Sequence, residues 1–245
     1  MNLKDLQKET KKLANPKKAK SYQWFFKTGK GEYGEGDEFY GITVPESRKV
    51  AKKYKDLSFS ELQILIKSRI HEERLIALLI LAYQYQKGDD KLKQKIFDFY
   101  LKNTKYINNW DLVDLSAHKI VGDYLFLQGR NLKEKIAEVP TLLTRLAKSK
   151  NLWERRIAMI STFAFIGNGS SKETIKIAEI LVNDSHDLIH KAVGWALREV
   201  GKRVSMKDEI KFLDKHASTM PRTALRYAIE RFEPNLRKMY LTKKK

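Results

Sequence analysis

Apolar residues along most of the chain recur at intervals of three and four, the spacing that places side chains on one face of an α-helix. From about Asp187 to Lys202 this face holds Ile189, Val193, Ala196, Leu197 and Val200. Strand-like runs are short, and Tyr40–Val44 is the best of them. With only five prolines and twelve glycines to interrupt helices, the pattern predicts an all-α fold.

Five segments with similar sequences, each at the expected start of a helix, recur along the chain. Anchored on Arg74, Asp114, Arg156, Lys191 and Arg222, they lie 40, 42, 35 and 31 residues apart. Shorter amphipathic stretches between the anchors supply partner helices. Such spacing is typical of helix-pair repeats. We therefore predict an α-solenoid, a curved stack whose concave face can wrap a rod-shaped partner.

No interdomain linker is evident, so residues 1–245 are expected to form a single repeat domain. Residues 1–60 would be N-terminal helices with a glycine-rich loop over 29–41, residues 61–235 the repeats, and residues 236–245 a basic tail. Glycines and small polar residues predict further loops at Gly129–Asn131 and Gly167–Ser171.

Charge narrows the choice of partner. The chain has 49 Lys and Arg against 30 Asp and Glu, a formal net charge of +19. Spread along a folded surface, this charge suits a phosphate backbone, although anionic membranes and acidic proteins are also candidates. The lack of cysteine excludes disulfides and thiol catalysis. The mean hydropathy of −0.53 and the absence of an apolar signal segment lead us to expect a cytoplasmic protein outside the membrane.

Two short motifs resemble known sites without their context. Gly29–Gly34 matches G-x-G-x-x-G, but no strand precedes it and acidic residues would repel a pyrophosphate, so we expect only a loop. His186 and His190 have the i, i+4 spacing of metal ligands, but no third ligand is evident. We therefore expect neither a metal nor a cofactor.

One basic stripe contains an aromatic residue. Lys191, Trp195, Arg198 and Lys202 share the helix face opposite the apolar one. A tryptophan among cations suits contact with a nucleic-acid backbone, base or sugar. The alternative is that Trp195 packs against a neighbouring repeat.

A second cluster joins an indole to a carboxylate. Trp110 and Asp114 are four residues apart and can touch on one helix face. Asp111 is placed to stabilise the helix N-terminus. Asp114 lies one turn further, where that explanation fades, so its carboxylate is a candidate electrostatic stabiliser or base.

The third cluster places two cations near a helix start. Arg155 and Arg156 are expected in the first turn, where the helix dipole disfavours positive charge. They therefore call for an anionic partner, either a phosphate or a neighbouring carboxylate.

These clusters together resemble the DNA alkylation repair glycosylases of the AlkD family, which are built from HEAT-like repeats. The strings that carry the resemblance are Asn109–Asp114, Asn151–Arg156 and Lys191–Glu199, with Phe25–Gly29, Gly34–Asp37 and Gly41–Pro45 before them. The similarity runs from about residue 20 to residue 235. Each string is weakly specific alone, and their shared order and spacing are more specific.

The resemblance implies a HEAT-like solenoid with a basic concave face that excises 3-methyladenine and 7-methylguanine from duplex DNA. Carried over by motif, the site residues are Asp114, Trp110, Trp195 and Arg156. Asp114 would stabilise positive charge on the sugar, the tryptophans would pack on deoxyribose, and Arg156 would hold a phosphate. Further DNA contacts are expected from Lys191, Arg198, Lys202, Arg155 and Arg222.

The resemblance also suggests that the lesion is read through the DNA backbone, without a deep base pocket. A deep aromatic pocket beside Asp114 would count against that mechanism. We expect a monomer that is associated with the nucleoid when bound to DNA. Two other functions stay open, namely a non-catalytic HEAT-like module that binds nucleic acid and a protein-binding scaffold.

Overall fold

The computed structural model describes residues 2–131 and 138–243, with the side chains of residues 130–140 left aside. Helices dominate these residues, and the only pairing of extended backbone among them is an isolated bridge between Glu38 and Ile70. The prediction of an all-α fold is confirmed. The contacts within the chain group it into two compact units, Met1–Ser116 and Ala117–Lys245, each of which is described by itself.

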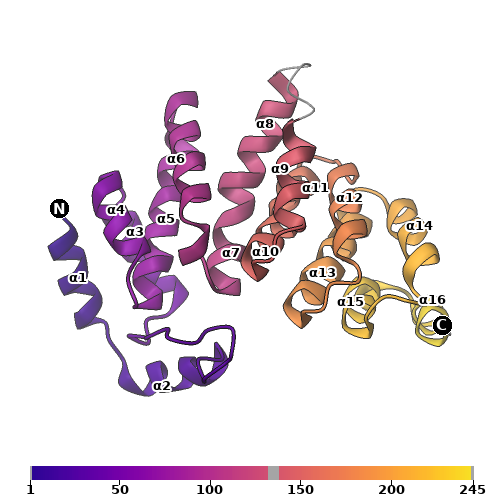
Figure 1. The fold of residues 1–245 in the computed structure, drawn as a ribbon, viewed down its shortest axis with the longest axis horizontal. Helices are drawn as coiled ribbons and strands as arrows, with labels where there is room; N and C mark the ends of the chain where they lie inside the picture. The colour runs from indigo at the N-terminus through magenta and orange to yellow at the C-terminus, as the bar shows by residue number, and fades with distance from the viewer. Residues whose placement is uncertain (1, 132–137, 244–245) are drawn as a thin grey trace. The chain divides into compact units, whose positions relative to one another are not determined.

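The first unit is built around one buried helix. Its elements, drawn from indigo to magenta in Figure 1, are α1 (Leu3–Lys12), α2 (Pro16–Phe25), α3 (Val44–Lys53), α4 (Phe59–Ile66), α5 (His71–Lys87), α6 (Asp90–Lys102), the 3-10 turn η1 (Thr104–Tyr106) and α7 (Trp110–Ala117). Helix α5 packs against α3, α4 and α6, and its first eleven residues are buried. This burial includes four polar or charged side chains at its N-terminal end, which the functional site uses.

Helix starts in this unit follow local sequence rules. Ser58 and Glu61 form a capping box at α4, and Thr43 and Glu46 form another at α3. In each, a hydroxyl residue and a carboxylate satisfy backbone N–H groups that the first helical turn leaves without partners. The capping box at Thr43 therefore fixes where the long loop after α2 ends and α3 begins.

The second unit gathers around α13 (Asp187–Arg203), which agrees to within one residue with the helix predicted from the apolar spacing. Helix α13 packs against α10 (Leu152–Ser161), α12 (Lys172–Leu181), α14 (Met206–His216) and α15 (Arg222–Ala228). The remaining elements are the π-helical turn η2 (His118–Gly122), α8 (Asp123–Asn131), α9 (Glu138–Ala147), α11 (Phe163–Gly167), the 3-10 turn η4 (Ile229–Arg231) and α16 (Pro234–Thr242).

Several local predictions can be compared with these elements. All five repeat anchors lie in α-helices, and the loop after Gly167 is confirmed. The loop predicted at Gly129–Asn131 is wrong, because these residues continue α8. Part of the predicted basic tail, residues 236–242, belongs to α16, while Lys244 and Lys245 lie outside the described residues. The single repeat domain stays a prediction.

Helix α13 approaches α15 so closely that one position excludes a side chain. A Cβ added at Gly194 would lie 2.3 Å from the carbonyl oxygen of Ala224 and 2.5 Å from Cβ of Tyr227. These distances are too short for real contacts, so the two backbones would have to separate. Gly194 is thus required for the packing of the helix that carries Trp195.

We predict that Gly194→Ala lowers the free energy of unfolding by about 1–3 kcal/mol, because the added methyl group overpacks the α13–α15 contact. Gly167→Ala is the control, since a Cβ at Gly167 meets nothing within 4 Å. That control should match or slightly exceed wild-type stability. Chemical denaturation of both variants checks the prediction, and equal stability of the two would contradict it.

Candidate active site

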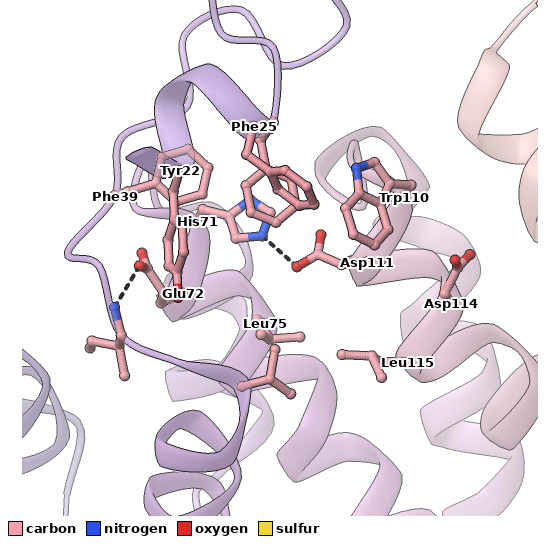
Figure 2. A pocket seen from close by; sticks show the side chains of 13 residues that line it. Tyr22, Phe25, Phe39, His71, Glu72, Leu75, Trp110, Asp111, Asp114 and Leu115 are labelled. Carbon is pink, nitrogen blue, oxygen red and sulfur yellow. Dashed lines mark hydrogen bonds and ion pairs between the residues drawn. The ribbon is translucent and has the colours of Figure 1, made fainter. Parts of the chain in front are cut away.

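The first unit contains a pocket of about 330 Å³ between α2, the loop that follows it, α5 and α7. Five aromatic side chains supply much of its lining: Tyr22, Phe25, Phe26, Phe39 and Trp110. Four ionisable side chains also line it: His71, Glu72, Asp111 and Asp114. Figure 2 shows most of these side chains around the pocket, with Asp114 on the opposite side from Tyr22 and Phe39. We call this cavity the aromatic pocket.

The aromatic side chains pack against one another and stiffen the wall. The ring of Phe26 stacks on Phe39 with centroids 5.2 Å apart and on Trp110 with centroids 5.2 Å apart. Phe25 meets Trp110 edge-on at 5.6 Å. Such contacts stabilise ring positions beyond simple area burial. The indole of Trp110 is thus held by two phenylalanines from the end of α2.

A buried histidine ties three segments together beneath this wall. His71, at the start of α5, is only 2% exposed. Its Nδ1 lies 3.1 Å from Asp37 Oδ2 in the glycine-rich loop, and its Nε2 lies 2.9 Å from Asp111 Oδ2 on α7. Arg74 donates a 2.7 Å hydrogen bond to the other oxygen of Asp37. Two buried cations and two buried carboxylates therefore balance one another.

The two carboxylates change the ionisation of His71. Burial alone would lower its pKa, but the charge and hydrogen bond of Asp111, together with the hydrogen bond of Asp37, raise the pKa to about 9. His71 is therefore an imidazolium at neutral pH, and both of its ring nitrogens donate. The same hydrogen bond, with the charge of Arg74, keeps the pKa of Asp37 below its ordinary value despite burial.

Glu72 fixes the second half of the loop. Its buried carboxylate accepts hydrogen bonds from the backbone N–H groups of Tyr40, Gly41 and Ile42, at 3.0, 2.7 and 3.1 Å. These residues belong to the run that looked most strand-like in the sequence, and they form no strand. Their backbone donors are satisfied by a side chain of α5 instead of by a neighbouring strand.

The pocket has the opposite charge to the rest of the protein. Its described lining contains three carboxylates and one imidazolium, and neither lysine nor arginine belongs to it. The chain as a whole carries +19. The oxygens of Glu72 and Asp111 bind backbone N–H groups and His71, so the accessible wall is mainly aromatic and suits a planar ligand.

Helix α7 places the predicted indole and carboxylate together. Trp110 and Asp114 are both half-buried and both line the aromatic pocket. Asp111 lies between them but turns the other way, so that one oxygen accepts the Leu112 N–H at 2.9 Å while the other meets His71. Asp111 therefore lies in the first turn of α7, as the sequence predicts, and it also binds His71, a contact that the sequence did not suggest.

The other two predicted site residues, Arg156 and Trp195, belong to the second unit. Arg156 is buried, and its guanidinium donates a hydrogen bond to the carbonyl oxygen of Leu188. Trp195 is half-buried, with its ring 4.5 Å from that of Phe163, centroid to centroid. Trp195 therefore packs against an aromatic neighbour while part of its indole stays accessible.

Four of the five cations expected to contact DNA have partners within the protein. Arg155 Nε lies 2.6 Å from Asp184 Oδ2, and Lys191 Nζ lies 2.6 Å from Asp187 Oδ2. The carboxylate alternative for Arg155 is thus present in the structure. The remaining three are Arg198, which pairs with Glu230 and Glu199, Arg222, which donates to the Leu241 carbonyl, and Lys202, which is exposed.

No cluster of three or more histidine, aspartate or glutamate side chains within residues 2–131 and 138–243 has the arrangement of a metal site. Over the same residues, no helix has the length and apolar character needed to cross a membrane.

Comparison with known proteins identifies the family. The profile of a family described as DNA alkylation repair enzyme matches residues 6–232. The chain belongs to this family. No curated protein matches it.

Two solved structures share the fold of this family member at 18% sequence identity each. One is described as a predicted DNA alkylation repair enzyme from Enterococcus faecalis, with a TM-score of 0.67 over 90% of this chain and 97% of that chain. The other is the crystal structure of AlkD2 from Streptococcus mutans, with a TM-score of 0.54 over 88% of this chain and 99% of that chain. Membership of a DNA alkylation repair family implies DNA as the substrate.

The family member's pocket bears on one earlier expectation. A deep aromatic pocket beside Asp114 is the feature expected to count against reading of the lesion through the backbone; an aromatic pocket of about 330 Å³ lies there, and reading through the backbone stays a prediction. Sequence reasoning also missed His71, Asp37 and Glu72. The strings Phe25–Gly29, Gly34–Asp37 and Gly41–Pro45 belong to this region, but the polar contacts join positions more than thirty residues apart, which a local pattern does not reveal.

We predict that the stability of the protein falls with rising pH through His71. Its pKa is higher in the folded chain than its ordinary value of 6.5, so protonation favours folding. The contribution is complete below about pH 6.5 and is lost as pH rises through about 9. His71→Gln should remove roughly 1–3 kcal/mol of unfolding free energy at pH 6 and much less at pH 9.5.

Denaturation curves at both pH values test this, with His216→Gln as the control. His216 meets Glu179 Oε2 at 2.8 Å on a different part of the chain. This control should keep the pH dependence that His71 provides. A wild-type curve that matches the His71→Gln curve at every pH would contradict the prediction.

Proposed function

We propose that the protein is a monofunctional DNA glycosylase that hydrolyses the N-glycosidic bond of cationic alkylated purines, such as 3-methyladenine and 7-methylguanine, in duplex DNA. The observation that carries the proposal is the joint position of Trp110 and Asp114 at a negatively charged aromatic pocket. Membership of the family supports DNA as the substrate. The carboxylate of Asp114 at the pocket supports an enzyme over a module that only binds DNA.

Alkylation at N3 or N7 gives the purine a positive charge, so the base leaves as a neutral molecule without added acid. As the glycosidic bond breaks, positive charge develops on the deoxyribose at C1′. The carboxylate of Asp114 would stabilise that charge, and water would then add to C1′ and lose a proton. The products are the free base and an abasic site, and the reaction requires neither a metal nor a cofactor.

The aromatic pocket would bind the cationic base itself. Trp110 and the phenylalanines offer π faces to a planar cation, an attraction that weakens once the base leaves as a neutral product. Because the pocket favours such contact, we propose that the lesion is recognised through its base as well as its backbone. This revises the expectation of recognition without a base pocket.

The second unit would supply the remaining DNA contacts. Trp195 would pack on deoxyribose and Arg156 would hold a phosphate near the lesion. The cations proposed to track the backbone are Lys191, Arg198, Lys202, Arg155 and Arg222, which would belong to the basic concave face of a HEAT-like solenoid. We further propose a cytoplasmic monomer that associates with the nucleoid through DNA. The remaining candidate is a non-catalytic module that binds nucleic acid.

We predict that the wild-type protein releases 3-methyladenine and 7-methylguanine from methylated duplex DNA, and that Asp114→Asn loses release by roughly 100-fold or more. The variant should bind DNA as tightly as the wild type or more tightly, because it removes a negative charge near phosphates. Chromatography of the released bases, with chelator present, and DNA-binding titrations provide the two measurements.

Asp98→Asn is the matched control, since Asp98 is an exposed carboxylate on α6 of the same unit. It should retain full release. Tight DNA binding without release by any of the three proteins would support the binding module and remove the chemical role of Asp114.

The charge preference of the pocket can be measured without DNA. At mildly acidic pH the nucleoside 7-methylguanosine is a cation, whereas guanosine of nearly the same shape is neutral. We predict that the cation binds roughly 5–30-fold more tightly, and that Trp110→Ala removes most of this preference. Calorimetry with both nucleosides measures it. Equal binding of the two, or no binding of either, would favour recognition through the backbone.

A further inference from the structure

The end of α2 exposes two large aromatic side chains beside the aromatic pocket. Trp24 is 76% exposed and Phe25 is 52% exposed. Single apolar side chains on a surface are ordinary, but an indole exposed to this extent next to a second aromatic ring is not explained by packing within the protein. Trp110 and Trp195 are half-buried by comparison, and Trp153 is buried. Trp24 is therefore available to an external partner.

A residue with left-handed backbone geometry follows the exposed rings at the end of α2. Directly after the aromatic run, Lys27 takes a positive φ of 55°, a left-handed conformation that residues other than glycine seldom adopt. Its carbonyl oxygen accepts the Gly34 N–H at 3.0 Å. Unfavourable backbone geometry that the surroundings maintain is often found at functional sites. Here the turn ends α2 directly behind the exposed rings.

The charge of this segment indicates the chemistry of the partner. Residues 16–31 contain five lysines and no acidic residue, and all five lysines are exposed. Lys27 Nζ lies 5.4 Å from the centre of the Trp24 ring. The next acidic residues in the loop, Glu32 and Glu35, accept hydrogen bonds from the loop's own backbone, at Gly29 and Gly31. A polyanion with planar groups complements this surface.

The segment also borders the proposed site. Phe25 follows Trp24 directly and meets Trp110 edge-on. Figure 2 shows the Phe25 ring between Trp110 and the rest of the aromatic wall. A DNA strand that reaches the aromatic pocket would therefore pass the end of α2.

We propose that residues 16–31, which we call the α2 tip, form a second DNA-binding element. The lysines would bind phosphates, and Trp24 would stack on a base exposed at the disrupted site in the duplex. The inference rests on the proposed function for the nature of the lesion, but it assigns binding and not chemistry to Trp24. It adds a contact that neither the sequence motifs nor the pocket identified.

The test is binding of the full chain to a duplex with a tetrahydrofuran abasic-site analogue, followed by fluorescence anisotropy. Trp24→Ala should weaken binding by roughly 5–100-fold, the effect of losing one aromatic–base stack, whereas Trp24→Phe should retain most of the affinity. Ile64→Ala is the matched control, because Ile64 is an apolar residue that is 56% exposed on α4 of the same unit. It should bind as the wild type does.

Salt dependence separates stacking from charge. Trp24→Ala should leave the slope of log K against log salt unchanged, and the double variant Lys27→Ala, Lys30→Ala should reduce the slope by about 2. Acrylamide quenching gives a third readout. DNA should protect the most accessible tryptophan in the wild type, and Trp24→Phe should lack that accessible component in both states.

The outcomes distinguish this proposal from the proposed function. Wild-type affinity of Trp24→Ala, or unchanged quenching of Trp24 on DNA, would overturn the role of the α2 tip and leave base release untouched. Weaker binding by Trp24→Ala in a protein that releases no base would support the tip and overturn the glycosylase. Self-association that Trp24→Ala abolishes would show that a second copy, not DNA, covers the indole.

Discussion

The imidazolium of His71 is the interaction on which the candidate site depends. It lies between two carboxylates, one from the glycine-rich loop and one from α7, with distances of 3.1 and 2.9 Å. Both bonds are buried, where a charge without a partner would be costly. The histidine can therefore keep its proton only while loop and helix are both in place. The loop, α5 and α7 form three of the walls of the aromatic pocket, so His71 joins most of its surroundings.

Phe26 and Phe39 extend this control to the aromatic wall, because both rings pack on the imidazole of His71 at 4.9 and 4.7 Å. Phe26 also stacks on Trp110. A continuous chain of contacts thus runs from a buried charge to the indole at the candidate site. Such support from neighbouring groups is what holds reactive side chains in a productive geometry.

In the proposed function, the surface and the pocket would have separate tasks in recognition. Surface cations would attract a polyanion over a distance and without regard to sequence. The pocket would then select among the groups that reach it, with Asp114 as the carboxylate assigned to the developing positive charge. Several surface cations, Arg155 among them, already pair with carboxylates inside the protein. For these residues, binding to DNA would exchange one anionic partner for another.

Local geometry explains which features the sequence could reveal. The i, i+4 relation of Trp110 and Asp114 depends only on helical periodicity, as does the extent of α13, and both follow from spacing alone. Gly129 was misread because glycine weakens a helix without always ending it. The contacts of His71 with Asp37 and of Glu72 with Gly41 join distant positions, and no local pattern announces them. The sequence could therefore predict that Trp110 and Asp114 lie together, but not the contacts that support them.

The way Glu72 holds residues 40–42 bears on how this region can change during evolution. The carboxylate binds backbone N–H groups, which every residue except proline carries, but Gly41 is fixed for another reason: its φ is +81° and a Cβ there would lie 2.3 Å from the carbonyl oxygen of Asn15. Asp37 is also bound to α5, through His71 and Arg74. This contact anchors the end of the stretch from Gly29 to Gly36. Gly34 lies against the pocket wall, because a Cβ there would come within 2.4 Å of the carbonyl oxygen of Phe26, so changes of length that spare the pocket are expected only before Gly34. Lineages could thus diversify the approach to the pocket while keeping its interior the same.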